Sequence, residues 1–274
     1  MIIAIIVVLV LLALGFVTFP GRTAEDKHDV ESFIKVAYAH RGLHNLDNGV
    51  PENSAKSFHE ASAAGYGIEL DVRLSSDNKV MVFHDDTLKR MCGIDAKVSD
   101  YTCDELENIM LLDTGETIPS LERALSVISK DTPVIVELKT GKKHELLCEL
   151  TAEHLRSAGG TYCIESFDPR IVGWFRRNAP EFIRGQLSSN MLKSKTYTVP
   201  LRIILTNLFF NFIARPHFIA YNHNDISNPF YILITKVFGA ISVVWTVRDM
   251  ETFNRFKKDC DMIIFEGFLP ETRY

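Results

Sequence analysis

The chain has 274 residues, of which 46% are hydrophobic and 24% are charged, and its formal net charge at pH 7 is −5. A single α/β barrel of about 250 residues fits this length, so the composition does not require a second domain. Because the chain lacks the excess of Lys and Arg that nucleic-acid binding demands, we predict no nucleic-acid partner.

The chain begins with an uncharged apolar segment, Ile2–Phe19. This segment is just long enough to cross a bilayer core as a helix. A cleaved signal peptide is the competing interpretation, but no Lys or Arg precedes the run and Phe19-Pro20-Gly21-Arg22 is a poor cleavage site. We therefore predict a transmembrane anchor over residues 1–20, a linker over residues 21–34 and a barrel domain over residues 35–274.

Two features bear on the location of the barrel domain. The Lys/Arg bias of the residues after the anchor is slight. The five cysteines are an odd number without metal-site spacing, which favours reduced thiols over a disulfide framework. We predict a membrane protein whose barrel domain lies on the cytosolic side.

Short apolar strand-like runs alternate with helical patterns through the rest of the chain, which is typical of βα units around a parallel sheet. The predicted strands are Lys35–His40, Gly67–Val72, Pro133–Leu138, Thr161–Phe167, Phe182–Leu187, His217–Asn222, Ile241–Val247 and Met262–Gly267. Eight parallel strands with intervening helices close into a TIM barrel, so we predict an α/β fold of the (β/α)8 type.

Helix starts are indicated by Asn53 or Ser54, by Ser120, and by Asp168, which precedes a proline. The segment Leu201–Ala214 is more apolar than an outer barrel helix needs, yet it is too short to span a bilayer comfortably. Two interpretations of it remain open: a core-facing helix, or an insertion that contacts lipid.

The second predicted strand carries two carboxylates, Glu69 and Asp71, on one face, because side chains in a strand alternate with a period of two. A two-residue turn at Asp77-Asn78 would follow this strand and form a β-hairpin, since both residue types tolerate positive φ. In that register Asp71 lies opposite His84. The pattern predicts that polar groups converge at the barrel mouth, where barrel enzymes place their active sites.

Similar polar residues end the first and third predicted strands. A carboxylate triplet offers hard oxygen ligands for Mg²⁺ or Ca²⁺, two cations suit an anionic substrate, and two histidines suit proton transfer near neutral pH. The carboxylates are Glu69, Asp71 and Glu137, the cations are Arg41 and Lys139, and the histidines are His40 and His84. Together they indicate cleavage of a phosphoester.

In these motifs the sequence resembles the glycerophosphodiester phosphodiesterase family. The matching motifs, in chain order, are His40-Arg41-Gly42, Pro51-Glu52-Asn53-Ser54, Glu69-Leu70-Asp71, His84-Asp85, Glu137 with Lys139, Ser166-Phe167 and Trp245-Thr246-Val247. The resemblance extends from Val36 to Pro270, and the ordered set is specific although each piece alone is weak.

The resemblance implies a TIM-barrel hydrolase that uses a divalent cation, Mg²⁺ or Ca²⁺, to cleave glycerophosphodiesters into sn-glycerol 3-phosphate and an alcohol. It implies metal ligands, an acid–base histidine pair and phosphate contacts at the three residue sets named above, and it places Glu52 and Asn53 in a supporting role. Phe167 and Trp245 either fill the core or line the pocket, and we take them as candidate substrate-binding residues.

The resemblance also implies a substrate-assisted mechanism, in which the glycerol 2-hydroxyl attacks phosphorus while one histidine accepts its proton and the other protonates the leaving alcohol. Which histidine acts first is left open. Two substrate classes remain: soluble deacylated diesters, or lysophospholipids in the bilayer. A barrel that only binds phosphodiesters is the alternative to an enzyme.

Overall fold

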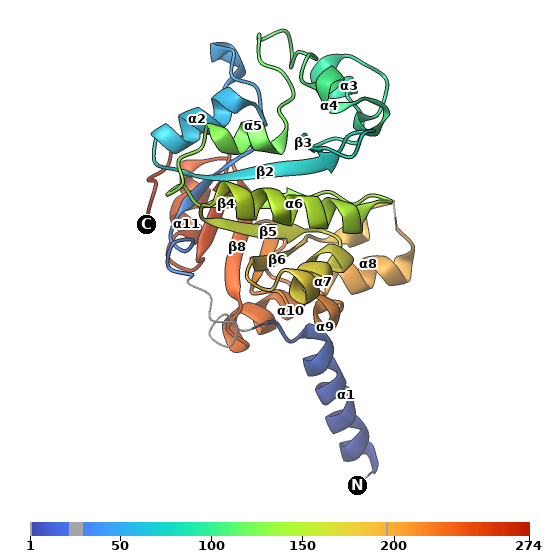
Figure 1. Cartoon of the computed structure of the whole chain (residues 1–274). Coiled ribbons are helices and arrows are strands. Elements are labelled where there is room, and N and C mark those ends of the chain that lie inside the picture. The colour runs from blue at the N-terminus through green and yellow to red at the C-terminus, as the bar shows by residue number, and fades with distance from the viewer. Residues whose placement is uncertain (1, 22–29, 196) are drawn as a thin grey trace.

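The computed structural model describes residues 2–21, 30–195 and 197–274 (Figure 1), so most of the predicted linker lies outside the described residues. Its centre is a closed parallel barrel of β1 (Ala37–His40), β2 (Gly67–Leu74), β4 (Val134–Leu138), β5 (Tyr162–Ser166), β6 (Ile183–Ser188), β7 (Phe218–Asn222), β8 (Ile241–Val247) and β9 (Met262–Phe265). The barrel closes because β1 pairs in parallel with both β2 and β9. The predicted (β/α)8 architecture is confirmed.

Helices cover the outside of this barrel (Figure 1). They are α2 (Ala55–Ala63), α5 (Leu121–Ser126), α6 (His144–Ala158), α7 (Pro169–Asn178), α8 (Val199–Thr206), α9 (Asn211–Ala214), α10 (Pro229–Ile232) and α11 (Met250–Phe256), with short helical turns at Leu46–Asn48, Val98–Asp100, Met191–Lys193 and Leu233–Val237. Ser54, Ser120 and Asp168 cap α2, α5 and α7 by accepting backbone N–H groups, as predicted. Of the two candidates for the first cap, Ser54 is the one that forms it.

The strand alternation separates two cores. In β2, Ile68 and Leu70 face outward into the layer between barrel and helices, and Glu69 and Asp71 are left to face inward. An inner core inside the barrel is built around large side chains such as Tyr38. Its ring lies against Gly67, where a Cβ would come within 2.6 Å of the ring, so only glycine fits there. The lower barrel is therefore packed apolar, and the polar groups gather above it.

The predicted hairpin is present, but its register differs from the prediction by one residue. β3 (Val80–Val82) pairs antiparallel to β2 with Val72 opposite Val82, which places Phe83, rather than His84, opposite Asp71. The Phe83 N–H donates to the Asp71 carbonyl at 2.9 Å. The reason is a three-residue loop, closed by Ser75 and Lys79 and containing Asn78 at φ +62°, in place of the two-residue turn.

The chain between β3 and α5 forms an excursion with its own small core. It contains α3 (Lys89–Cys92) and α4 (Cys103–Leu106), at the top right of Figure 1. Buried side chains such as Phe83, Leu106 and Ile118 hold it together. Because it packs on the hairpin, this excursion brings additional charged side chains to the rim of the barrel.

The N-terminal apolar segment forms α1 (Ile2–Thr18), which extends away from the barrel (Figure 1). Its C-terminal end is fixed by Asn211, which donates to the Thr18 carbonyl at 3.0 Å, and by the Arg215 guanidinium, which lies 5.1 Å from the Phe16 ring. Across residues 2–21, 30–195 and 197–274, no helix combines the length and the apolar character needed to cross a membrane. This finding does not support the predicted transmembrane helix.

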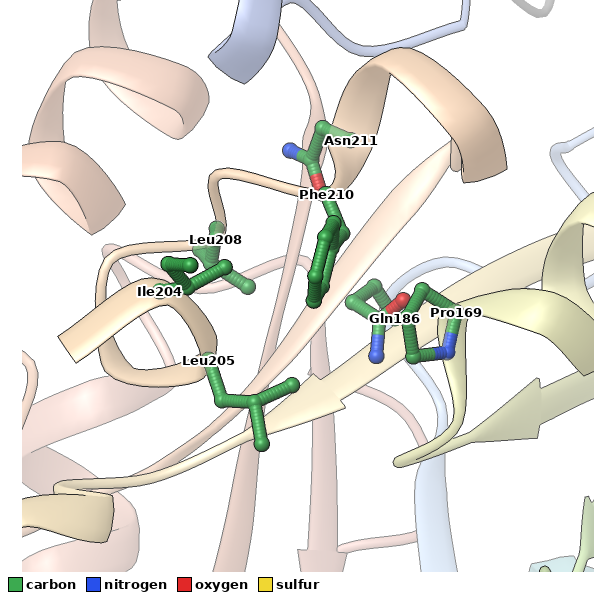
Figure 2. Close-up of a pocket in the computed structure, with 7 residues that line it drawn as sticks. All are labelled: Pro169, Gln186, Ile204, Leu205, Leu208, Phe210 and Asn211. Atoms are coloured by element: carbon green, nitrogen blue, oxygen red, sulfur yellow. The ribbon is translucent and has the colours of Figure 1, made fainter. Parts of the chain in front are cut away.

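The segment Leu201–Ala214 spans two helices, the end of α8 and all of α9, because the chain turns at Leu208, whose φ is +59°. Figure 2 shows Phe210 beside Gln186 and Pro169, with Leu208 beside Ile204 across the cavity. The cavity lined by these side chains is about 10 Å³, enough for about one water molecule and no larger ligand. This part of the segment therefore packs against the barrel, as the core-facing interpretation predicted.

Candidate active site

Three carboxylates meet at the carboxyl end of neighbouring strands. The parallel register sets His40 of β1 beside Glu69 of β2, and Asp71 of β2 beside Glu137 of β4. Ligand atoms of Glu69, Asp71 and Glu137 lie within 4.8 Å of one another, and all three side chains are buried. The predicted acidic triplet is thus brought together in one buried cluster.

Two cations contact this triplet. The Lys139 ammonium lies 2.6 Å from Asp71 Oδ1 and 2.7 Å from Glu137 Oε1, and Arg41 Nε lies 3.4 Å from Asp71 Oδ2. Burial alone would favour a neutral Asp71, but Lys139 and Arg41 outweigh it and hold the pKa of that carboxyl below its usual range. Asp71 is therefore the firmly ionised member of the triplet.

If all three carboxylates were ionised, the two cations would not balance the negative charge of Glu69 and Glu137. Burial, followed by repulsion from Asp71 and Glu137, raises the pKa of Glu69 well above its usual range. Burial likewise raises the pKa of Glu137 to about 7, although Lys139 opposes the shift. A divalent cation would neutralise this excess, and three buried carboxylate oxygens are the hard ligands that Mg²⁺ and Ca²⁺ take. The residues present therefore fit such an ion.

Asn53 and Glu52 support the cluster rather than extend it. The Asn53 side chain donates to Asp71 Oδ2 at 2.7 Å and fixes that carboxylate. Glu52 accepts from Arg41 Nη1 at 2.7 Å and from Arg90 Nη2 at 2.7 Å. Glu52 therefore holds the guanidinium of Arg41 in position, while Asn53 orients the acidic triplet.

The turn after β1 has an unusual backbone that serves the site. Arg41 has φ +60°, and its N–H donates to Glu69 Oε2 at 3.0 Å. Gly42 follows at φ +81°, and a Cβ there would lie 2.8 Å from the Ser57 backbone. Only glycine tolerates both the conformation and the close approach. The His40-Arg41-Gly42 motif thus folds one main-chain donor onto the acidic triplet.

His40 is backed by a carboxylate. Its Nδ1 lies 2.9 Å from Glu266 Oε2, and Glu266 in turn accepts from Arg248 Nη2 at 2.9 Å. Burial lowers the pKa of His40 below its ordinary value of 6.5, although the Glu266 hydrogen bond raises it in part. The imidazole Nε2 lies 4.0 Å from Glu69 Oε2, so the ring faces the acidic triplet.

His84 has a parallel arrangement on the hairpin side. Its Nδ1 lies 2.6 Å from Asp85 Oδ1, and Asp85 accepts from Arg90 Nε at 2.7 Å. Burial lowers the pKa of His84, and the nearby charge of Asp71 opposes the shift. Each histidine therefore has a carboxylate on Nδ1 and an arginine behind that carboxylate, which leaves Nε2 as the nitrogen for proton transfer.

Phe167 directly follows β5, and Trp245 lies near the end of β8. Their rings contact edge to face with centroids 5.7 Å apart, and both pack on the inner core of the barrel. The Trp245 Nε1 atom is buried and has no hydrogen-bond partner among the described residues. The structure brings these two residues together; their contact with substrate stays a prediction.

Three charged residues near the site were not singled out from the sequence. Glu266 lies near the end of the last predicted strand, Met262–Gly267, and directly follows β9 in the structure, a position that matches the strand-end rule used for the other site residues. Glu165 pairs in register with Glu137, and burial raises its pKa well above the usual range. Arg90 comes from the excursion after β3, for which the sequence offers no comparable signal.

Comparison with known proteins agrees with this fold and site. The family model described as the glycerophosphoryl diester phosphodiesterase family matches residues 40–265. The chain therefore belongs to this family.

Among curated proteins, a glycerophosphodiester phosphodiesterase of Caldanaerobacter subterraneus is 39% identical over 114 residues, or 38% of this chain and 44% of that relative. The chain thus matches less than half the length of this relative. A crystal structure of a glycerophosphodiester phosphodiesterase from Parabacteroides distasonis has TM-score 0.65 and 26% identity, covering 84% of this chain and 92% of that one. The structure of an Oleispira antarctica phosphodiesterase in complex with the product sn-glycerol-3-phosphate has TM-score 0.70 and 24% identity, covering 87% of this chain and 95% of that one.

Proposed function

We propose that this chain hydrolyses glycerophosphodiesters to sn-glycerol 3-phosphate and an alcohol. The observation that carries the proposal is the buried cluster of Glu69, Asp71 and Glu137, set between two carboxylate-backed histidines at the carboxyl ends of the barrel strands. Membership of the family over residues 40–265 supports the same activity.

Proton transfer falls to His40 and His84. Burial lowers the pKa of both rings below 6.5, which favours the neutral form that accepts the proton of the hydroxyl. The ring that acts as the acid must start protonated, and the carboxylate on its Nδ1, Glu266 for His40 or Asp85 for His84, favours that form. In the first step one histidine accepts the proton of the glycerol 2-hydroxyl as it attacks phosphorus, and the other donates a proton to the leaving alcohol. This step forms a cyclic phosphate of glycerol and releases the alcohol. Water then opens the cyclic phosphate, with the two histidines exchanging their roles.

The negative charge on the reacting phosphate would be stabilised by a divalent ion held by the acidic triplet and by two neighbouring cations. Glu69, Asp71 and Glu137 would hold Mg²⁺ or Ca²⁺, which when bound supplies positive charge to the phosphate and lowers the pKa of the hydroxyl. Arg41 and Lys139 add two fixed positive charges on the same side. Glu52 and Asn53 keep Arg41 and Asp71 in place, and Phe167 and Trp245 form an aromatic wall for the glycerol or the alcohol.

The test is release of glycerol 3-phosphate from glycerophosphocholine by the purified full chain. We expect release with Mg²⁺ or Ca²⁺, and loss of activity with EDTA that either ion restores. No release from glycerophosphocholine, glycerophosphoethanolamine or glycerophosphoinositol with either ion would instead support a barrel that only binds phosphodiesters.

We further propose that α1 attaches the enzyme to a lipid surface. Its side chains are exposed on successive positions, with Leu11 and Leu12 at 62% and 65%, and α1 carries no charge. Such a surface is costly to leave in water and is favoured by lipid. Vesicle flotation tests this: the full chain should float with phosphatidylcholine vesicles, and a Leu9→Asp/Leu12→Asp variant should not. Flotation of both would contradict the proposal.

Membrane attachment would also bring lysophospholipids within reach. Choline release from lysophosphatidylcholine in vesicles, compared with release from glycerophosphocholine, distinguishes the two substrate classes. A higher kcat/KM for the lipid, lost in the Leu9→Asp/Leu12→Asp variant, would assign the lysophospholipid as substrate. Equal loss of activity on both substrates would point to a folding defect in the variant.

A further inference from the structure

A groove next to the acidic triplet is lined, apart from Lys139, by residues that the proposed mechanism does not use. Its volume is about 560 Å³, and it lies between the β2–β3 hairpin, the Val98–Asp100 turn and the loop from β4 to α6. Figure 1 shows β2, β3 and α6 as neighbours on one side of the barrel. Lys139 lines this groove and also contacts Asp71 and Glu137 of the acidic triplet, so the groove lies beside the catalytic centre.

The volume of this groove suits a large ligand group. Sites for small organic ligands have volumes of about 300–1,000 Å³, which is far more than a choline or ethanolamine group fills. A substrate whose phosphorus lies at Lys139 would therefore place a bulky alcohol in the groove.

The groove concentrates positive charge on a chain whose net charge is −5. Its charged lining consists of Arg73, Lys97, Lys139, Lys142 and Lys143, with Asp86 as the carboxylate among them. Lys139 is already paired with Asp71 and Glu137, so the other four cations against one carboxylate give a local excess of three positive charges. We call this surface the cationic groove.

Most of this charge is available to a ligand. Lys142 is exposed and makes no ion pair with any described residue, and Lys143 donates to a neutral acceptor, Asn78 Oδ1, at 2.7 Å. The Asp86 carboxylate pairs with both Lys97, at 2.9 Å, and Arg73, at 3.6 Å, so it offsets only one of these two positive charges. An anion in the cationic groove would meet uncompensated positive charge.

Neutral donors line the same surface. Ser76 and Ser99 line the cationic groove. α6 begins there at His144, and its N-terminus has no side-chain cap, so first-turn N–H groups add partial positive charge. Glu145 in that turn is exposed and does not line the groove. Hydroxyl and amide donors beside several cations favour a ligand that is both hydroxylated and anionic.

We propose that the cationic groove is the binding site for a leaving alcohol that is a phosphorylated polyol, so that the enzyme prefers glycerophosphodiesters of such alcohols. The inference rests on the proposed function and adds the substrate class. Cleavage keeps the usual balance: water supplies the hydroxyl that ends on phosphorus, and its proton ends on the released polyol phosphate.

Three substrates isolate the contribution of charge. Glycerophosphoinositol 4-phosphate and glycerophosphoinositol share the inositol ring and differ by one phosphate, and glycerophosphocholine has a cationic alcohol. We expect kcat/KM to be at least about ten-fold higher for glycerophosphoinositol 4-phosphate than for glycerophosphoinositol, the scale of two or three partly screened ion pairs. The ratio should fall towards one as NaCl rises from about 0.05 to about 0.5 M, since salt screens such pairs.

A charge-reversal pair provides the matched control. Lys142→Glu/Lys143→Glu should lower the ratio between the two inositol substrates at least about ten-fold. Lys130→Glu/Lys258→Glu makes the same change in net charge at exposed residues before β4 and β9, at the other end of the barrel, and should leave the ratio unchanged. Because the readout is a ratio within one protein, partial loss of folded enzyme does not affect it.

The outcomes separate the two proposals. Cleavage of glycerophosphocholine and glycerophosphoinositol without preference for the phosphorylated substrate, or an equal change of the ratio in both variants, overturns the groove assignment and leaves the proposed function standing. If no diester is cleaved, the proposed function fails. The groove is then tested by calorimetry with inositol 4-phosphate and the full chain: tighter binding than to myo-inositol, weakened in Lys142→Glu/Lys143→Glu, supports it, and equal binding overturns it.

Discussion

Replacing Glu266 with Gln removes the carboxylate that lies 2.9 Å from His40 Nδ1. The hydrogen bond from His40 is the first cause that lowers the pKa of Glu266 from 4.5 to about 2. The same negative charge favours the protonated form of His40, so its loss should lower the pKa of His40 further. The sign is therefore fixed: the limb of the pH profile that reports His40 moves to lower pH.

The size of the expected shift in the His40 pKa depends on how exposed the Glu266 side chain is to solvent. The Glu266 side chain is 24% exposed and also pairs with Arg248, so solvent and the second partner weaken its effect on His40. We assign about 1 to 1.5 kcal/mol to the His40–Glu266 pair, which corresponds to about one pH unit in the pKa of His40. Burial still keeps the His40 pKa below 6.5 in the unchanged chain, because its desolvation outweighs the pair.

The assay is kcat/KM for glycerol 3-phosphate release against pH, with NMR titration of the His40 ring as a direct readout. Glu271→Gln is the matched control, since Glu271 pairs with Lys257 and does not contact either histidine. We expect one limb and the His40 resonance to move by about one pH unit in Glu266→Gln and not in Glu271→Gln. An unmoved profile, or movement to higher pH, would refute the reasoning.

Three other predictions concern the same site. His84→Ala should lower kcat by about 10²-fold or more with circular dichroism unchanged, whereas exposed His59→Ala should keep normal kcat; near-normal turnover in His84→Ala would contradict the acid–base role. Glu137→Gln should weaken Mg²⁺ or Ca²⁺ binding and remove the rise in Tm that either ion gives the unchanged chain, and calorimetry showing equal affinity would exclude Glu137 as a ligand. Asn53→Ala should lower the free energy of unfolding by about 1 to 3 kcal/mol in urea titrations, because Asp71 loses a buried hydrogen bond; unchanged stability would show that the bond contributes little.

The strand count and the acidic triplet could be predicted from the sequence because both follow from short-range patterns. Alternation in β2 separates Glu69 and Asp71 from Ile68 and Leu70, and parallel strands bring their carboxyl ends to one rim. The hairpin register could not be predicted, since it depends on two hydrogen bonds within the loop: the Ser75 hydroxyl donates to the Lys79 carbonyl and accepts from the Lys79 N–H. Because of this shift of one residue, Phe83 lies opposite Asp71, where the prediction placed His84.

Residues supplied by long-range packing were also out of reach. Arg90 reaches Glu52 and Asp85 only because the excursion after β3 folds back on the barrel rim. The sequence does not single out Lys142 and Lys143, because their role depends on the groove beside Lys139. Glu266, by contrast, stands at a strand end and obeys the rule that found the other site residues.

The central claim is that Glu69, Asp71 and Glu137 hold one divalent cation, and anomalous diffraction from crystals grown with Mn²⁺ or Ca²⁺ tests it most directly. We predict a single strong peak about 2.0 to 2.6 Å from one oxygen of each carboxylate. Absence of a peak in this pocket, with the Lys139 ammonium still between Asp71 and Glu137, would contradict the account.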